Sequence, residues 1–277
     1  MTTEAVPTPN AVPKLSVENV SVTYLGRSGD DVHAVNDVSF QIMDKPGVGE
    51  IVVFLGPSGC GKSTLLKCIA GLMAPSKGRV LVDGAPIQGT SRDRGMVFQQ
   101  YTSFAWRTVQ KNVEYGLELN GVPKAERAAQ AAEVLKQVGL ADFANQFPKA
   151  LSGGMKQRVA IARTLVNKPR LLLMDEPFGA LDPQTRWSMQ SLVLDISRKL
   201  DNTLLFVTHD VSEAVYIADS IFVLSPRPAS ILKRIEVPYF EERTPALKQT
   251  AQFRALENEI LEMLHGAPGA KADIRLS

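Results

Sequence analysis

The stretch EIVVFLGPSGCGKSTLLKCIAGLM, residues 50–73, is the part of the chain that decides its fold. It begins with an unbroken apolar run of the length that a strand buried on both faces requires, and it ends in a helical pattern. Between these two elements lies GPSGCGKST, residues 56–64, which fits the pattern G-x-x-x-x-G-K-[ST]. A strand before this pattern and a helix after it distinguish a phosphate-binding loop from a glycine turn that happens to precede a lysine. The stretch therefore predicts a nucleotide site.

Each residue type in this loop has a chemical reason. The glycines let the backbone curl, so that its amide groups face one centre and can hold phosphate oxygens. We expect Lys62 to reach the outer phosphates and the Ser63 hydroxyl to bind Mg²⁺. The predicted nucleotide-binding residues of the loop are Gly56, Pro57, Ser58, Gly59, Cys60, Gly61, Lys62, Ser63 and Thr64.

Two carboxylates end a second apolar strand, LLLMDEP at residues 171–177. Successive side chains of a strand point to opposite sides, so the two acids are expected to have different roles. We expect Asp175 to bind Mg²⁺ through its water shell and Glu176 to face the water that attacks the γ-phosphate. The alternative is a solvated strand end, which the phosphate-binding loop elsewhere in the chain makes the weaker interpretation.

Two further polar residues follow apolar strands. His209 follows the strand in TLLFVTHD, and a lone histidine more often packs or caps a helix than takes part in catalysis. Its position at the same predicted strand edge as Asp175 favours a functional role. Gln99 ends GMVFQ, and its amide oxygen could reach the metal or the water, although a glutamine at a strand end means little by itself.

The stretch LSGGMKQRVAIARTL, residues 151–165, predicts a second anion site. Ser152 suits the N-cap of a helix, where its hydroxyl accepts a hydrogen bond from an amide of the first turn. A cap does not need Gly153 and Gly154 behind it, because glycine weakens a helix start unless something must approach the backbone closely. A helix N-terminus with exposed amides attracts anions. The alternative is a plain capped helix, which would tolerate larger residues at both glycine positions.

The composition is that of an ordinary globular protein. The formal net charge of +2 gives no reason to expect nucleic acid as a partner. Two cysteines form no disulfide framework, which favours a reducing compartment. No apolar run approaches the roughly eighteen residues that span a bilayer, and residues 1–13 have the character of a flexible tail rather than of a secretion signal. We therefore expect a cytoplasmic protein.

Strands and helices alternate along most of the chain, which predicts an α/β fold with a parallel sheet covered by helices. Alternating apolar and polar residues before the loop predict an antiparallel β layer. Helical patterns predominate at about residues 100–165, where we expect an inserted helical subdomain. We place the core domain at residues 14–240 and a C-terminal tail at 241–277, with one charged amphipathic helix at 245–265.

Taken together, these motifs resemble the ATP-binding subunits of ABC transporters. The resemblance covers about residues 15–240 and rests on motifs in a fixed order, which are GPSGCGKST, Gln99, LSGGMKQR, LLLMDEP, GALD and His209. It implies a P-loop NTPase core of the ABC ATPase type, ATP and Mg²⁺ as ligands, and ATP hydrolysis as the activity. It also implies two copies that close head to tail, with each ATP between the phosphate-binding loop of one copy and Ser152, Gly153 and Gly154 of the other.

The resemblance assigns roles to single residues. Tyr24, in VSVTYLG, is similar to the aromatic residue that stacks on adenine, although a half-exposed strand tyrosine is the alternative. Glu176 resembles the general base, and His209 resembles the residue that contacts the γ-phosphate and the water. Gln99 is similar to the contact with the metal and the water. Asp182 lies in GALD, a segment that is similar to the loop that communicates with the other copy's site.

The resemblance further implies partners and a location. The partners are two integral membrane permease subunits, which the segment after Gln99 would meet, and indirectly an extracytoplasmic solute-binding protein. The chain would then be a peripheral subunit at the cytoplasmic face of the inner membrane. TSFAW, residues 102–106, carries aromatic side chains that suit a socket for a partner helix. Packing inside the helical subdomain is the alternative for this segment.

Within the family, three segments resemble ATPases of the nitrate, sulfonate and taurine importer group: TSFAWRTVQKNVEYGL, DEPFGALDPQTR and THDVSEAVYIADSIFVLSPRPASI. The chain does not encode the solute, so nitrate, taurine, other alkanesulfonates, bicarbonate, aromatic acids and vitamin precursors stay open. The alternative function is a soluble ABC-type ATPase of repair, cluster assembly or translation. The sequence has no sustained heptads, one nucleotide domain and a net charge near zero, all of which disfavour that alternative.

Overall fold

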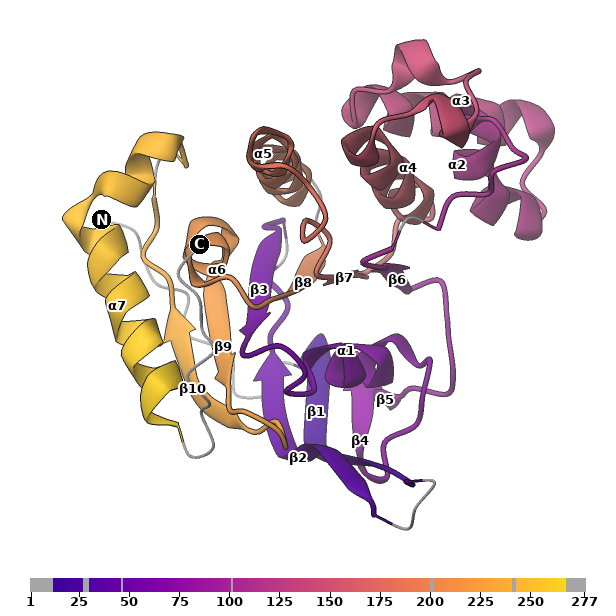
Figure 1. Ribbon diagram of the computed structural model, residues 1–277. Coiled ribbons are helices and arrows are strands. Elements are labelled where there is room, and N and C mark those ends of the chain that lie inside the picture. The colour runs from indigo at the N-terminus through magenta and orange to yellow at the C-terminus, as the bar shows by residue number, and fades with distance from the viewer. Residues whose placement is uncertain are drawn as a thin grey trace.

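The computed structural model describes residues 12–26, 30–45, 47–100, 102–199, 202–240 and 243–267. In this part of the chain, two β-sheets form separate layers, and helix α1 (Lys62–Ala70) contacts strands of both (Figure 1). The predicted α/β fold with an antiparallel β layer is confirmed. Of the predicted flexible tail, residues 1–11 lie outside the described residues.

The central sheet has six strands, in the order β10-β9-β3-β8-β7-β6. Their bounds are Glu50–Leu55 for β3, Arg94–Val97 for β6, Leu171–Asp175 for β7, Thr203–Thr208 for β8, Ser220–Leu224 for β9 and Ile231–Glu236 for β10. β10 is antiparallel to β9, and all other neighbours are parallel. Parallel neighbours end at the same edge of a sheet, where ligands of such folds bind. The segments that follow β3, β7, β8 and β9 therefore emerge together.

The second sheet is antiparallel, in the order β2-β1-β4-β5. Its strands are β1 (Leu15–Tyr24), β2 (Val32–Ile42), β4 (Lys77–Val82) and β5 (Ala85–Pro86). Tyr24 pairs with Val32 at the end of the β1–β2 ladder. This end of the ladder lies beside the phosphate-binding loop, because both residues line the same cavity as Lys62.

Strand β3 divides the interior into two cores. Ile51, Val53 and Leu55 face the core that the helices cover, whereas Val52 and Phe54 face the core shared with α1 and the antiparallel sheet. All five side chains are buried. Because both faces of β3 are covered, alternating polar residues would be costly, and the strand is apolar at successive positions.

Helices cover the face of the central sheet away from α1 and extend from its β6 edge (Figure 1). α5 (Pro183–Lys199) and α6 (Val211–Ile217) lie on the sheet. α2 (Val109–Leu119), α3 (Lys124–Gln137) and α4 (Gly153–Leu165) form a separate group with the short 3₁₀ turns Ala141–Phe143 and Pro148–Ala150. This group matches the helical character predicted for about residues 100–165, although the limits of a subdomain stay a prediction. Across the described ranges, the helices lack the combination of length and apolar character that crossing a membrane requires.

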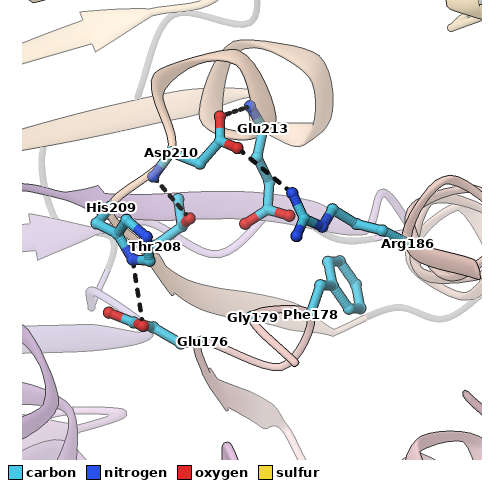
Figure 2. Close-up of a pocket in the computed structure, with 8 residues that line it drawn as sticks. All are labelled: Glu176, Phe178, Gly179, Arg186, Thr208, His209, Asp210 and Glu213. Carbon is cyan, nitrogen blue, oxygen red and sulfur yellow. Dashed lines mark hydrogen bonds and ion pairs between the residues drawn. The ribbon is translucent and has the colours of Figure 1, made fainter. Parts of the chain in front are cut away.

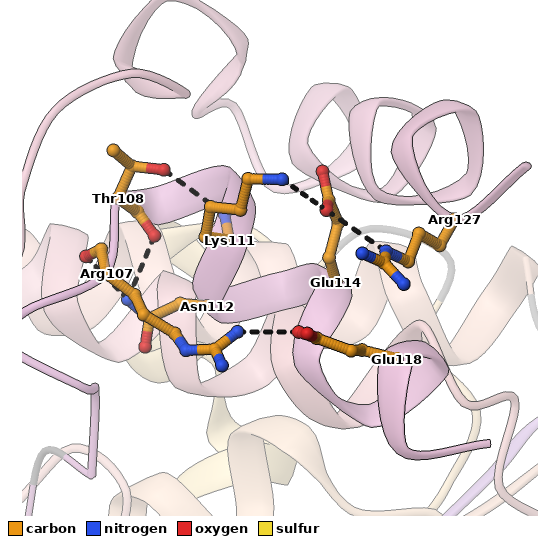
Figure 3. Close-up of polar contacts among 7 residues, drawn as sticks. All are labelled: Arg107, Thr108, Lys111, Asn112, Glu114, Glu118 and Arg127. Carbon is orange, nitrogen blue, oxygen red and sulfur yellow. Dashed lines mark hydrogen bonds and ion pairs between the residues drawn. The ribbon is translucent and has the colours of Figure 1, made fainter. Parts of the chain in front are cut away.

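A buried asparagine organises the segment that enters this helical group (Figure 3). The side chain of Asn112 is fully buried; its amide oxygen accepts a hydrogen bond from the Phe104 amide (2.7 Å), and its amide nitrogen donates to the Phe104 carbonyl (3.1 Å). The same nitrogen also donates to the carbonyls of Arg107 and Thr108. Trp106 lies within this segment and is 75% exposed. Asn112 therefore fixes the backbone of residues 104–108, while the side chain of Trp106 in this segment faces solvent.

The C-terminal part differs from the sequence-based expectation. β10 was not predicted, because Ile235 is its one buried side chain and charged residues interrupt the pattern. The predicted single helix at 245–265 is wrong: a 3₁₀ turn, Pro245–Gln249, precedes α7 (Ala251–Gly266). The break falls at Thr250, whose hydroxyl accepts the Phe253 amide and caps α7. The apolar side of α7 belongs to the same core as α6 and β9, through Phe253, Ile260 and Leu264.

Candidate active site

The phosphate-binding loop connects β3 to α1, as the sequence predicts. Gly59 and Gly61 have φ angles of 74° and 129°, a region that residues with side chains rarely adopt. A Cβ at Gly61 would lie 2.3 Å from the carbonyl oxygen of Ala34 in β2, so only glycine fits. α1 begins directly after Gly61, and no side chain caps it among the described residues. Its first amides are therefore available to an anion.

Lys62 is nearly buried, at 3% exposure. Its ammonium group donates to the carbonyl oxygens of Gly56 (2.8 Å) and Pro57 (2.9 Å). Glu176 Oε1 lies 3.7 Å from the same nitrogen. The loop thus holds a positive charge at its centre, next to one carboxylate, where it can attract the outer phosphates of a nucleotide.

The hydroxyl of Ser63 donates to Asp175 Oδ1 at 2.6 Å, which joins the start of α1 to the end of β7. Burial raises the pKa of Asp175, and the hydrogen bond from Ser63 opposes this effect. A hydroxyl and a carboxylate are the oxygen ligands that Mg²⁺ takes from proteins, usually in small number, with water and phosphate oxygens completing its octahedron. These two residues therefore fit the predicted metal site.

Glu176 follows Asp175 in the chain, and its carboxylate faces His209 (Figure 2). Its φ of 43° is unusual for a residue with a side chain, and such backbone strain often occurs at functional sites. Its Oε2 lies 3.2 Å from His209 Nδ1. The hydrogen bond from His209 holds the pKa of Glu176 below its ordinary value, and the same contact raises the pKa of His209. The two acids thus have different partners, and the positive φ of Glu176 adds to the effect of strand alternation. Their different roles stay a prediction.

The register of the sheet explains why these residues meet. Leu55 pairs with Thr208, and Val207 pairs with Asp175. The residues after the three strands therefore leave the sheet at one edge, which places the phosphate-binding loop, Glu176 and His209 together. This agrees with the expectation that His209 lies at the same edge as Asp175.

Two predicted site residues have no direct contact with this centre. Gln99 is exposed, and its amide lies beside Gly179, where a Cβ would be 3.7 Å away. In the described structure it forms no hydrogen bond with Ser63 or Asp175. Asp182 is also exposed and accepts the Thr185 amide at 3.0 Å, so that it caps α5. Its role at a second copy's site and the metal contact of Gln99 stay predictions.

The predicted second anion site is built as a helix start. The Ser152 hydroxyl accepts the Met155 amide at 3.3 Å and caps α4. The segment is not near this chain's own phosphate-binding loop: α4 lies in the helical group, apart from α1 (Figure 1), and residues 151–154 do not line the cavity around Lys62. A Cβ at Gly154 would lie 2.4 Å from Thr185 Cγ2. Packing within the chain is therefore one reason for this glycine, which the sequence did not indicate.

The cavity over the phosphate-binding loop extends to the antiparallel sheet. Tyr24 lines it, is 42% exposed and has its hydroxyl 3.1 Å from Thr64 Oγ1. Val32, Ala34 and Arg227 also line this cavity and were not predicted. For Arg227 the signal was present in SPRPASI, a polar segment that directly follows a buried strand.

Glu176 also lines a second cavity (Figure 2). Arg186, in α5, lines it and has its Nη1 3.9 Å from Asp210 Oδ2. Glu213 lies deeper and accepts a hydrogen bond from Gln190 at 3.0 Å, and burial raises its pKa. These residues connect α5, which follows the Asp182 loop, with α6, which follows His209. Sequence reasoning missed them because their pairing depends on how two distant helices pack.

The model of the ABC transporter family matches residues 35–179, which include the phosphate-binding loop and Glu176. The chain belongs to the ABC transporter family. The match ends before His209, whose place beside Glu176 is seen in the structure.

Two curated ABC transporter relatives extend this similarity over most of the chain. The taurine import ATP-binding protein TauB of Rhizobium johnstonii is 44% identical over 256 residues, which cover 91% of this chain and 96% of the relative. The nitrate import ATP-binding protein NrtD of Synechocystis is 45% identical over 258 residues, with 91% and 95% covered. A solved dimeric ATP-binding cassette, in a post-hydrolysis state with ADP and Pi, superposes with a TM-score of 0.68 at 33% identity; it covers 82% of this chain and is itself fully covered. These similarities confirm the predicted family and its ABC ATPase fold.

Proposed function

We propose that this chain is the ATP-hydrolysing subunit of a membrane importer for nitrate, taurine or another sulfonate-like small solute. One observation carries the proposal. The edge of the central sheet brings together a phosphate-binding loop, the Ser63–Asp175 pair and the Glu176–His209 pair. A module that only binds a nucleotide needs the first of these, whereas hydrolysis also needs a group that activates water.

In this proposal, each side chain has one task. Lys62 and the amides of the phosphate-binding loop hold the outer phosphates of ATP. Glu176 is kept ionised by His209, so it can accept a hydrogen bond from the attacking water and then its proton. His209 uses Nδ1 for Glu176, which leaves Nε2 to face the γ-phosphate. Mg²⁺, which Ser63 would hold directly and Asp175 through water, would neutralise charge on the phosphates.

The active unit in this proposal is a head-to-tail pair of copies. Ser152 caps α4, and Gly153 and Gly154 begin this helix, which lies apart from the chain's own phosphate-binding loop. The three residues are therefore free to serve the nucleotide of the other copy. Asp182 would meet the same nucleotide from the loop before α5. The dimeric cassette bound to ADP and Pi is a similar chain in a paired state, which supports this arrangement.

We further propose that the exposed segment around Trp106 meets two permease subunits at the cytoplasmic face of the inner membrane. Asn112 fixes the shape of this segment, as a docking surface requires, and Gln99 precedes it. A partner in the membrane would explain how a chain whose described helices cannot span a bilayer serves transport. The relatives named for taurine and nitrate import favour a sulfonate or oxyanion as solute, delivered by an extracytoplasmic binding protein.

Glu176→Gln tests the hydrolysis mechanism. The variant keeps size and hydrogen bonding but loses the base, so we expect ATP binding and ATP-dependent dimers in light scattering, with turnover reduced at least about 100-fold, the lower range for a general base. Glu133→Gln, an exposed substitution of the same type in α3, should hydrolyse ATP normally. Turnover by Glu176→Gln within a few-fold of the wild type would contradict the mechanism.

A further inference from the structure

We propose that Arg227 is a nucleotide-binding residue whose guanidinium group contacts the α-phosphate of bound ATP or ADP. The inference rests on the proposed function and deepens it. Arg227 follows β9, in a segment to which the motifs of the family assigned no role, and it lines the cavity above the phosphate-binding loop.

The position of Arg227 begins with the topology of the sheet. β9 runs parallel to β3, and Val223 pairs with Leu55. The segment after β9 therefore leaves the sheet at the same edge as the phosphate-binding loop and directly beside it. The contact is close: a Cβ at Gly56 would lie 3.1 Å from the carbonyl oxygen of Leu224.

The turn that carries Arg227 is fixed on both sides. Its own hydrogen bonds join Ser225 Oγ to the Ser230 amide (2.9 Å) and to the Pro228 carbonyl (3.0 Å). Ala229 is bound to β2, because its amide donates to the Ala34 carbonyl (2.9 Å) and its carbonyl accepts the Asn36 amide (2.9 Å). The backbone on which Arg227 sits is thus held by strand-like bonds and does not need a ligand to order it.

The same turn touches the phosphate-binding loop. A Cβ at Gly61 would lie 3.1 Å from the Ala229 Cβ. Ala34, which binds Ala229, is two residues from Val32 and on the same face of β2. Val32 pairs with Tyr24, which marks the end of the cavity where the resemblance to ABC ATPases places adenine. The Arg227 turn therefore lies between that end and the loop that holds the outer phosphates, which is the place of the α-phosphate and the ribose.

The positive charge of Arg227 favours a phosphate group as its ligand over the uncharged ribose. Arg227 is exposed, and among the described residues it forms neither an ion pair nor a side-chain hydrogen bond. Lys62 differs, because its ammonium already donates to two carbonyls of the loop. A guanidinium group binds phosphate oxygens through paired, charge-assisted hydrogen bonds. Arg227 has no other charged partner among the described residues, and its turn lies where the α-phosphate of a bound nucleotide would be. It is therefore well placed for this contact.

Calorimetric titration of the purified full-length chain with ADP tests the inference. We expect Arg227→Ala to bind ADP about ten-fold more weakly than the wild type, which corresponds to about 1.4 kcal/mol. Arg227→Lys retains the charge without the fork and should lose less. Arg92→Ala removes another exposed arginine, from a turn that lines neither cavity, and should bind as the wild type does. Raising the salt concentration should shrink the Arg227→Ala effect, because screening weakens an exposed charge contact.

A second titration assigns the contact to the phosphate. Adenosine, measured by competition with a fluorescent ADP analogue, should bind Arg227→Ala and the wild type equally. An equal loss for adenosine and ADP would move the contact to the base or ribose and overturn the assignment. If Arg227→Ala binds ADP as tightly as the wild type does, the inference is wrong, but the proposed function still stands. A wild-type chain that binds no ADP would remove both.

Discussion

Replacing Gly154 by alanine tests why a glycine starts helix α4. Gly154 is buried, and a Cβ there would lie 2.4 Å from Thr185 Cγ2. Carbon atoms in contact are normally about 3.5–4.0 Å apart, so α4 must shift or Thr185 must leave its rotamer. Overpacking of this kind costs about 1–3 kcal/mol, and the better helix propensity of alanine returns at most about 1 kcal/mol. We expect the free energy of unfolding to fall by about 1–2 kcal/mol.

Urea denaturation of four proteins measures this effect: the wild type, Gly154→Ala, Thr185→Ser and the double variant. Serine removes the Cγ2 methyl but keeps the hydroxyl, whose hydrogen bond to Asp182 is the main cause of that residue's lowered pKa. The double variant should therefore regain most of the lost stability, with a coupling energy of about 1 kcal/mol or more. A Gly154→Ala protein as stable as the wild type, or a double variant no better than the single one, would refute the packing argument.

The ATPase rate of the same four proteins separates two reasons for the glycine. If the double variant regains stability but not hydrolysis, Gly154 also lets the helix approach the other copy's nucleotide, as proposed above. If it regains both, the contact with Thr185 accounts for the glycine completely. The approach of Gly153 and Ser152 to a nucleotide would then have to be tested at those positions.

Two further predictions concern stability. The pKa of Glu176 is lowered and that of His209 is raised in the folded protein. Glu176 therefore adds to the free energy of unfolding at pH values above its unfolded-state pKa of about 4.3, and His209 adds to it at pH values below its unfolded-state pKa of about 6.5. The difference in unfolding free energy between the wild type and His209→Gln should thus be largest near about pH 5–6 and shrink as the pH rises through the folded-state pKa of His209; urea titrations across this range check it, and a difference that grows up to pH 9 would contradict it. Arg243, with 7% of its side chain exposed, donates to two backbone carbonyls and pairs with Asp219, so Arg243→Ala should lose about 2–4 kcal/mol. The melting temperature of Arg243→Ala should fall accordingly, whereas that of Arg92→Ala should equal the wild-type value. An Arg243→Ala protein that melts at the wild-type temperature would show that the contacts of Arg243 do not stabilise the fold.

The parts of the site that the sequence predicts are those that short segments encode. The strand, loop and helix around Lys62 are adjacent in the chain, so their pattern contains the geometry. Asp175 and His209 are distant from it, but both follow apolar runs, and a parallel sheet brings the ends of such runs to one edge. The pairing of Leu55 with Thr208, and of Val207 with Asp175, confirms that inference.

Other features depend on contacts that no local pattern contains. Strand alternation predicted separate roles for Asp175 and Glu176, but the left-handed backbone at Glu176 arises where the chain leaves the sheet and could not be read from residue types. β10 has mostly exposed side chains and is a strand because it pairs with β9. The break before α7 falls at Thr250, but the residue type alone does not indicate it, since a threonine can cap a new helix as well as lie inside a longer one.

Arg227 shows how far the combination of sequence and structure extends. In the sequence it is one arginine between two prolines, in a segment that resembles the importer group but to which we assigned no site residue. Its relevance comes from three long-range facts: β9 lies next to β3, the turn after β9 is bound to β2, and both border the phosphate-binding loop. The parallel strands all end at the same edge of the sheet. A strand that contributes no catalytic residue, such as β9, can therefore be followed by a charged residue that lies beside the substrate. Binding residues of this fold should therefore be sought after each such strand, and not only after those that carry a motif.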